Sequence, residues 1–435
     1  MKGAVRFERE SRIDCSAEEL GAWHFRSGAI HRLIPPWERI EVRREASPLV
    51  DGAVAEIGIR KGPVVVTLVA EHAEVDPPRQ FVDFQRSGPF GSWRHVHRFE
   101  AVDGGARLRD AIAFDPPLGA LGRVLLKRPM LREIDRQFAF RHERTRADLA
   151  RHAEIAARFG ERRLRVGVTG ASGLVGTQLC AFLSTGGHEV VRFVRGTPRG
   201  AGERPWNPGD PERGLDPALV EDLDAVVHLA GAGIADKRWS DERKREIRES
   251  RTLGTACVAR AIARAARRPE VLVSASAIGF YGARGDDPVD ERPGAGTGFL
   301  PDGVQAWEDA TVAARDAGVR VVHARFGVVL AAAGGALGKM RTPFALGAGG
   351  PVGSGRQGFS WISLDDLLGA MLFALRNEAL RGPVNFVAPI PLAQRGFAKV
   401  LGRVMRRPSI APLPAFVVRA LFGDSVDRAY VPFDL

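Results

Sequence analysis

Residues 164–176 constrain the fold of this chain more than any other stretch. They read Leu-Arg-Val-Gly-Val-Thr-Gly-Ala-Ser-Gly-Leu-Val-Gly, which is an apolar strand, a glycine-rich turn and the start of an apolar helix. In that order the first turn glycine permits the tight turn, the second lets a pyrophosphate approach the backbone, and the third lets the helix pack closely. The helix N-terminus adds unpaired N–H groups and a positive dipole end. A ligand-free glycine turn is the alternative, but the surrounding strand and helix favour a dinucleotide site.

Alternating strands and helices follow this turn. Strands are predicted at residues 164–168, 189–194, 224–229, 271–275 and 319–325, with helical stretches between them. This pattern is typical of a Rossmann-type α/β fold with a doubly wound parallel sheet. The residues predicted to bind the dinucleotide are Thr169, Gly170, Ser172, Gly173, Leu174, Val175, Gly176, Arg195, Leu229, Ala230, Gly231 and Ser274.

The end of the second of these strands predicts which cofactor is bound. NAD sites usually carry an acidic residue there, which binds the ribose 2′-hydroxyl group. This chain has Val194 followed by Arg195, and an arginine suits a 2′-phosphate. A surface arginine is the alternative, since arginine is common in this chain. We therefore expect NADP rather than NAD.

Residues 1–155 have a different pattern. Seven strand-like runs are separated by turn signals such as Asp51-Gly52 and Asp103-Gly104-Gly105, and a capped helix is predicted over Ser16–Phe25. A long helix follows, with Ile134, Phe138 and Leu149 on one stripe. The order predicts an α+β unit that precedes the Rossmann-type domain.

Composition excludes some classes of protein. The net charge is +11, but basic and acidic residues alternate, as in 241–246, which indicates a solvated helix face rather than a nucleic-acid surface. No apolar run approaches the roughly 18 residues of a membrane span, and the N-terminus lacks the apolar region of a signal peptide. Three well-separated cysteines fit buried thiols in a reducing compartment. We expect a cytoplasmic protein with a small-molecule substrate, no transmembrane segment and no nucleic-acid partner.

Two histidines raise the question of a metal site. His95 and His97 are two residues apart on a predicted strand, so they share a face. No third ligand with suitable spacing lies near them in the sequence. We therefore predict solvated or cavity-lining histidines and no metal site.

The first 155 residues resemble the START-like (SRPBCC) helix-grip superfamily. The likeness is carried by Gly88-Pro89-Phe90, Trp93-Arg94-His95, Phe99-Glu100, Asp103-Gly104-Gly105 and Leu108. It implies a domain over residues 1–155 in which a curved sheet grips the long helix, often around a cavity for an apolar ligand.

Residues 163–435 resemble the extended short-chain dehydrogenase/reductases, and within them a nucleoside-diphosphate-sugar epimerase-like, cell-division-inhibitor-like subgroup. The marks are the glycine turn, His228-Leu229-Ala230-Gly231, Ser276 with Tyr281-Gly282, Trp206-Asn207-Pro208, residues 234–239, Gly298-Phe299-Leu300, Trp307-Glu308, residues 358–362, Asp365-Asp366 and residues 382–385. The resemblance implies an NADP-binding Rossmann domain with a C-terminal substrate lobe over about 330–435. Residues 397–422 are predicted to be largely helical.

The chain departs from these reductases at their proton-transfer motif, Tyr-x-x-x-Lys. Its two tyrosines, Tyr281 and Tyr430, are followed four residues later by Gly285 and Asp434, and the expected place reads Val-Gln-Ala-Trp-Glu over 304–308. We expect Ser276 and Tyr281 as catalytic candidates, with Glu308 or Asp236 as an alternative base. The residues predicted to bind substrate are Asp236, Lys237, Trp239 and Arg325. Each has a plainer interpretation: Tyr281 as a packed side chain, Asp236 and Lys237 as a surface ion pair.

Two functions fit these observations. The first is an NADP(H)-dependent oxidoreductase or epimerase-like enzyme fused to a domain that presents an apolar ligand. The second is a protein that senses NADP(H) without turnover, which the missing Tyr-x-x-x-Lys favours. The sequence does not choose the substrate, the reaction direction, the ligand of the first domain or the oligomeric state.

Overall fold

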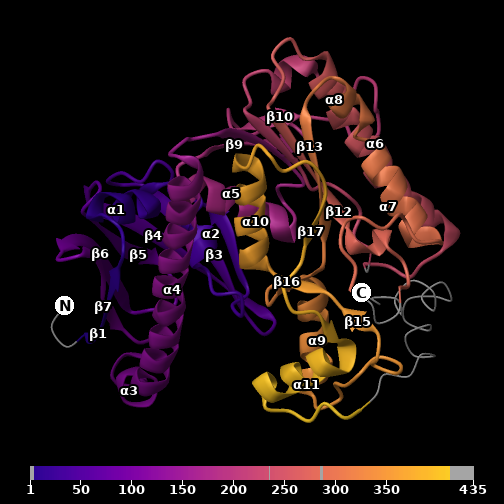
Figure 1. The fold of residues 1–435 in the computed structure, drawn as a ribbon. Coiled ribbons are helices and arrows are strands. Elements are labelled where there is room, and N and C mark those ends of the chain that lie inside the picture. The colour runs from indigo at the N-terminus through magenta and orange to yellow at the C-terminus, as the bar shows by residue number, and fades with distance from the viewer. Residues whose placement is uncertain (1–3, 235, 285–287, 412–435) are drawn as a thin grey trace. The chain divides into compact units, whose positions relative to one another are not determined.

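The computed structural model of the protein describes residues 4–234, 236–284 and 288–411 (Figure 1). These residues fall into two compact units. The first unit is formed by the described residues of two ranges, Met1–Arg163 and Gln178–His188. The second is formed by those of Leu164–Thr177 and Glu189–Leu435. No helix in the described ranges is long and apolar enough to cross a membrane.

The first unit is built on one seven-stranded antiparallel sheet in the order β1-β7-β6-β5-β4-β3-β2. Its strands are β1 (Val5–Ile13), β2 (Ile40–Arg44), β3 (Val54–Lys61), β4 (Val64–Asp76), β5 (Gln80–Ser87), β6 (Ser92–Val102) and β7 (Gly105–Asp115). Its helices are α1 (Ala17–Phe25), α2 (Ala29–Leu33), α3 (Gly119–Leu125) and α4 (Lys127–Phe159). Each predicted strand and the capped helix is present, and Ser16 Oγ accepts from the Glu19 N–H at 3.0 Å.

Alternation along the strands places one face of this sheet in the core. In β7 every second residue is buried: Ala106, Leu108, Asp110, Ile112 and Phe114. Helix α4 lies along the sheet (Figure 1). Its buried stripe includes Ile134, Phe138 and Leu149. Asp110 is therefore a carboxylate in a row of apolar side chains, and His142 of α4 is buried in the same interior.

The second unit contains a seven-stranded parallel sheet in the order β10-β9-β8-β11-β12-β13-β17. Its strands are β8 (Arg165–Thr169), β9 (Glu189–Val194), β10 (Glu203–Pro205), β11 (Ala225–His228), β12 (Val271–Ala277), β13 (Arg320–Phe326) and β17 (Gly382–Phe386). The five predicted strands are present, and β11 and β12 are buried along almost their whole length, as strands covered on both faces are. Strand order reverses at β8, so a crevice for ligands is expected at the carboxyl ends beside it.

Helices and short sheets complete this unit. The helices are α6 (Asp241–Arg264), α7 (Phe299–Asp309), α8 (Val312–Asp316), α9 (Gly335–Ala345), α10 (Leu364–Arg376) and α11 (Gln394–Met405), with 3-10 turns η1 (Pro217–Val220) and η2 (Ile278–Phe280). Helix α5 (Leu174–Thr185) begins in this unit, and its residues from Gln178 on belong to the first. Strands β14 (Val328–Ala331) and β16 (Trp361–Ser363) form one two-stranded sheet, and β15 (Gly358–Phe359) and β18 (Leu392–Ala393) form another.

The substrate lobe over about 330–435 stays a prediction, and within that range β17 pairs with β13 of the main sheet. Another expectation for the C-terminal part needs correction. The helix predicted over 397–422 ends at Met405, where Arg406 takes a left-handed conformation with φ 53°. Pro408 follows two residues later and would not continue a helix. Residues 412–422 and Tyr430 lie outside the described ranges.

Candidate functional site

The turn between β8 and α5 has the backbone that its glycines require. Gly170 has φ +67°, and a Cβ there would lie 2.8 Å from the carbonyl carbon of Leu229. A Cβ on Gly176 would lie 2.1 Å from the carbonyl oxygen of Gly170, so only glycine lets α5 approach the turn. Gly173 and Ser172 are exposed, and Leu174 and Val175 begin the helix, half-buried. The first N–H groups of α5 therefore border an open, glycine-lined surface, which suits a pyrophosphate.

Thr169 ties this turn to the end of β11. Its buried Oγ1 accepts hydrogen bonds from the backbone N–H of Leu229 at 3.1 Å and of Ala230 at 3.3 Å, and it lies 2.8 Å from His228 Nδ1. With two bonds accepted, the hydroxyl proton is directed to Nδ1, so His228 carries its proton on Nε2. Burial lowers the pKa of His228 to about 4 and keeps the ring neutral. The predicted cofactor segments 169–176 and 229–231 are thus brought together.

The other two predicted cofactor residues lie on flanking strands. Arg195 is exposed directly after β9, the neighbour of β8. Ser274 is buried in β12, opposite His228 of β11. Arg195 follows the carboxyl end of β9, where the ligands of such sheets bind, whereas Ser274 is the middle residue of β12.

A buried polar network lies at the carboxyl ends of β12, β13 and β17. The strand register aligns Ser276 with Arg325 and Arg325 with Asn385. Glu308 of α7 accepts from Ser276 Oγ at 2.6 Å and from Arg325 Nε and Nη2 at 2.8 Å each. Arg325 Nη1 donates to the Tyr281 hydroxyl at 2.9 Å, and that hydroxyl donates to Asn385 Oδ1 at 2.7 Å.

The catalytic candidates predicted from the sequence, Ser276, Tyr281 and Glu308, are hydrogen-bonded within this network. Arg325 is buried and uses its guanidinium on Glu308 and Tyr281, with its carbon centre 3.5 Å from the Phe280 ring centroid. Burial raises the pKa of Tyr281, and Arg325 only partly offsets this, so the phenol stays protonated at neutral pH. The catalytic roles of Ser276 and Tyr281 and the substrate role of Arg325 stay predictions, and these contacts favour a structural role for Tyr281 and Arg325.

The remaining substrate candidates lie on the segment between β11 and α6. Asp236 and Lys237 are exposed, and Asp236 Oδ1 is 3.7 Å from Lys339 Nζ of α9. Trp239 is buried, donates from Nε1 to the Ile234 carbonyl at 2.9 Å and packs edge-to-face on Phe299. Trp239 thus has the contacts of a packing residue, whereas Asp236 and Lys237 remain accessible.

Sequence reasoning missed Arg251, which lies in α6. Its Nη1 donates to the carbonyls of Ala232 and Ile247, both at 3.0 Å, and its guanidinium carbon lies 5.0 Å from the Trp307 ring centroid. Burial lowers its pKa to about 10, so it remains charged at neutral pH, and no carboxylate among the described residues pairs with it. A Cβ on Gly231 would lie 3.4 Å from Arg251 Cγ. In the sequence Arg251 looks like one more charge of the run at the start of the helix, because only the fold places it, half-buried, beside Trp307.

Comparison with known proteins finds relatives of the second unit and one solved structure that matches almost the whole chain. A profile of the NAD dependent epimerase/dehydratase family matches residues 166–387. An epimerase family protein of Mycobacterium bovis is 45% identical over 263 residues, which cover 60% of this chain and 86% of the relative. The crystal structure of the human epimerase family protein SDR39U1 with NADPH is 35% identical, with a TM-score of 0.56 over 61% of this chain and 89% of the human one.

A further solved structure matches almost the whole length. The nucleoside-diphosphate sugar epimerase from Corynebacterium glutamicum is 31% identical, with a TM-score of 0.77, and the match covers 98% of this chain and 90% of that one. The predicted nicotinamide dinucleotide is confirmed at the level of the family. The profile match and the identity to these relatives show that the chain belongs to the NAD dependent epimerase/dehydratase family.

Proposed function

We propose that the second unit binds NADP(H) at the carboxyl ends of β8, β9 and β11, and that the protein is an NADP(H)-dependent oxidoreductase of the epimerase/dehydratase type. The observation that carries this is the β8–α5 turn, in which Thr169 holds segment 229–230 beside an exposed Gly173. The bound dinucleotide would supply hydride chemistry. Arg251, a half-buried cation beside Gly231 without a carboxylate partner among the described residues, would neutralise an anionic group of the dinucleotide or the substrate.

Arg195 is the residue that we assign to the 2′-phosphate. It is exposed at the end of β9, next to the strand that carries the glycine turn, and it follows an apolar residue where an acid would repel the phosphate. Changing Arg195→Glu should raise the Kd for NADPH about tenfold or more, since a hydrogen bond to a charged group contributes about 1.5–3 kcal/mol. The Kd for NADH should stay the same or fall.

Fluorescence titration of the purified chain with each nucleotide measures this preference. Arg199→Glu is a matched control, because Arg199 is also exposed on the segment after β9 and changes the net charge equally. A ratio of NADPH to NADH affinities that is unchanged in Arg195→Glu would show that Arg195 does not read the 2′-phosphate.

A second function, a cofactor sensor without turnover, is favoured by one specific contact. Glu308, at the place of the family's lysine, is held by Arg325 and Ser276, and Val304 stands where the tyrosine would be. Nicotinamide absorbance during incubation with a panel of carbonyl compounds and alcohols separates the two functions. Substrate-dependent oxidation or reduction supports the enzyme; tight NADPH binding without redox change across the panel supports the sensor.

For the first unit we propose a helix-grip domain that presents an apolar ligand. The support is its topology: an antiparallel sheet entered by β1, the α1–α2 insertion between β1 and β2, and the long α4 packed along the sheet. Apolar clusters on either side of the buried histidines, one around Trp23 and Phe99 and one around Phe114 and Phe138, provide a suitable interior.

A further inference from the structure

We propose that Asp83, His95 and His97 in the first unit bind a divalent transition-metal ion such as Zn²⁺. The three residues come from adjacent strands. Asp83 of β5 lies directly opposite His95 of β6, and His97 lies two residues further along on the same face. The antiparallel register thus places the Asp83 carboxylate beside two imidazoles that follow it in the sequence by 12 and 14 residues.

The distances among these side chains suit a shared ion. Asp83 Oδ2 is 3.1 Å from His95 Nδ1 and 3.1 Å from His97 Nε2. One ligand atom from each residue lies within 4.8 Å of the others. Around a tetrahedral ion bound at about 2.0–2.1 Å, neighbouring ligand atoms are about 3.3 Å apart. The two contacts of Asp83 already match this spacing, and the two imidazole nitrogens would approach each other from a separation of at most 4.8 Å. Two imidazoles and one carboxylate leave a fourth position open.

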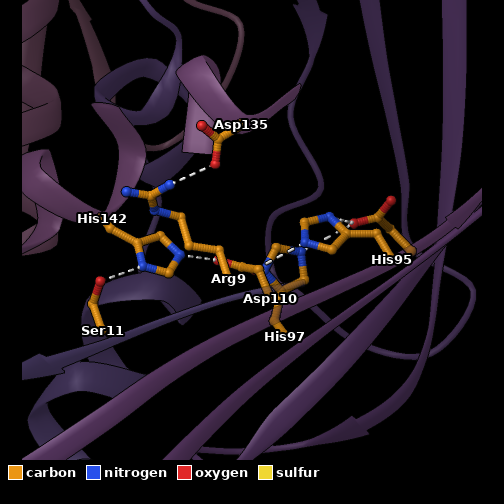
Figure 2. Close-up of polar contacts among 8 residues, drawn as sticks. Arg9, Ser11, His95, His97, Asp110, Asp135 and His142 are labelled. Atoms are coloured by element: carbon orange, nitrogen blue, oxygen red, sulfur yellow. Dashed lines mark hydrogen bonds and ion pairs between the residues drawn. The ribbon is translucent and has the colours of Figure 1, made fainter. Parts of the chain in front are cut away.

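The surroundings of the two histidines are those of metal ligands. The second nitrogen of each ring, His95 Nε2 and His97 Nδ1, lies 2.8 Å from Asp110 Oδ1. Asp110 Oδ2 in turn is 2.7 Å from His142 Nε2, and His142 Nδ1 is 2.8 Å from Ser11 Oγ, as Figure 2 shows. A carboxylate on the distal nitrogen fixes the orientation of a metal-binding imidazole and raises its basicity. One carboxylate here serves both rings.

Burial argues for an ion as well. His95, Asp110 and His142 are almost completely buried, and Asp83 is the most accessible member, with 16% of its side chain exposed. Two carboxylates in such an interior need compensating positive charge. Protonated imidazoles supply it in the ion-free network, and a divalent ion would supply it in their place. Asp83 also accepts from Trp93 Nε1 at 3.2 Å through its other oxygen, so Oδ2 remains directed at the histidines. Access to the ion would therefore be from the side of Asp83.

The sequence predicted solvated or cavity-lining histidines and no metal site. His95 and His97 are buried, with ring centroids 3.7 Å apart and ring planes tilted by 46°, so they are not solvated. The sequence did not indicate the third ligand because Asp83 lies on the preceding strand, β5. Only the pairing of β5 with β6 places Asp83 opposite His95.

The test uses the full chain, stripped with a chelator and titrated with Zn²⁺ by calorimetry and with Co²⁺ by visible absorption. We expect one ion per chain and Co²⁺ bands of a low-symmetry nitrogen and oxygen site. Asp83→Asn and His97→Gln should abolish saturable binding. Asp110→Asn, which removes only the distal support, should weaken it about 10–100-fold. His152→Gln is the control, because His152 is a half-buried histidine of the same unit whose ring bonds the Phe182 carbonyl, away from the three ligands.

Two results would overturn the proposal. One is the absence of saturable Zn²⁺ and Co²⁺ binding by the folded wild-type chain, which would leave the cluster as a buried ion-pair network. The other is binding that Asp83→Asn and His97→Gln, shown by circular dichroism to be folded, leave unchanged, which would place the ion elsewhere. The Co²⁺ spectrum distinguishes loss of a ligand from general destabilisation, because Asp110→Asn should keep the bands at saturating Co²⁺.

Discussion

A single hydroxyl group, that of Thr169, positions the dinucleotide turn. It satisfies the N–H groups of Leu229 and Ala230 and directs its proton to His228. In Thr169→Val the side chain keeps its shape but loses the hydroxyl, so two half-buried N–H groups and one buried ring nitrogen lose a partner. Leaving a buried polar group unsatisfied costs about 1–3 kcal/mol. We expect a loss of this size in the free energy of unfolding and weaker NADPH binding.

Urea denaturation and NADPH titration of the same preparation measure both effects. Thr169→Ser retains the hydroxyl and should stay close to the wild type in affinity. Equal NADPH affinity in Thr169→Val and wild type would mean that the turn holds its shape without the hydroxyl.

At the scale of the element, a buried ion pair between Glu308 and Arg325 joins helix α7 to the sheet. Glu308 is the residue of α7 that binds both β12 and β13, through Ser276 and Arg325. Glu308→Gln keeps the shape but leaves the Arg325 guanidinium buried without its counter-charge. Removing one partner of such a pair costs about 3–5 kcal/mol. We expect a loss of this size in the free energy of unfolding, measured with urea.

The neighbouring Asp309→Asn provides the comparison. Asp309 is exposed on the same helix, so this change should stay within about 0.5 kcal/mol of the wild type. Similar stabilities for Glu308→Gln and Asp309→Asn would show that the pair with Arg325 is not what fixes α7.

The elements themselves were predictable because their signals are local. Alternation gave β1 through β7, continuous apolar runs gave β8, β11 and β12, and the glycine spacing placed the turn at Gly170. The contacts between elements were not predictable from the sequence, because they depend on strand register and on packing. Glu308 meets Arg325 across 17 residues and Asp83 meets His95 across a strand pairing, and neither has a spacing signature in the chain.

At the scale of the whole molecule, buried neutral histidines make stability depend on pH. Burial lowers the pKa of His24 to about 3, and of His152 and His228 to about 4. Each is below the value of about 6.5 for an unfolded chain, so the unfolded state binds protons more readily. The stability that these neutral rings allow is therefore fully present above pH 6.5 and is lost as the pH falls toward 4.

His228 offers the cleanest test of this behaviour, because burial is the cause of its shifted pKa. A shift from 6.5 to about 4 corresponds to a loss of about 3 kcal/mol between pH 7 and pH 4, at about 1.4 kcal/mol per pKa unit. His228→Asn replaces Nδ1 with an amide oxygen that can still accept from Thr169 but cannot take up a proton. The variant should be less stable than the wild type at pH 7 and lose less stability on acidification. Urea denaturation across pH 7 to 4 measures the two slopes, and parallel curves would show that His228 is not a source of the acid sensitivity.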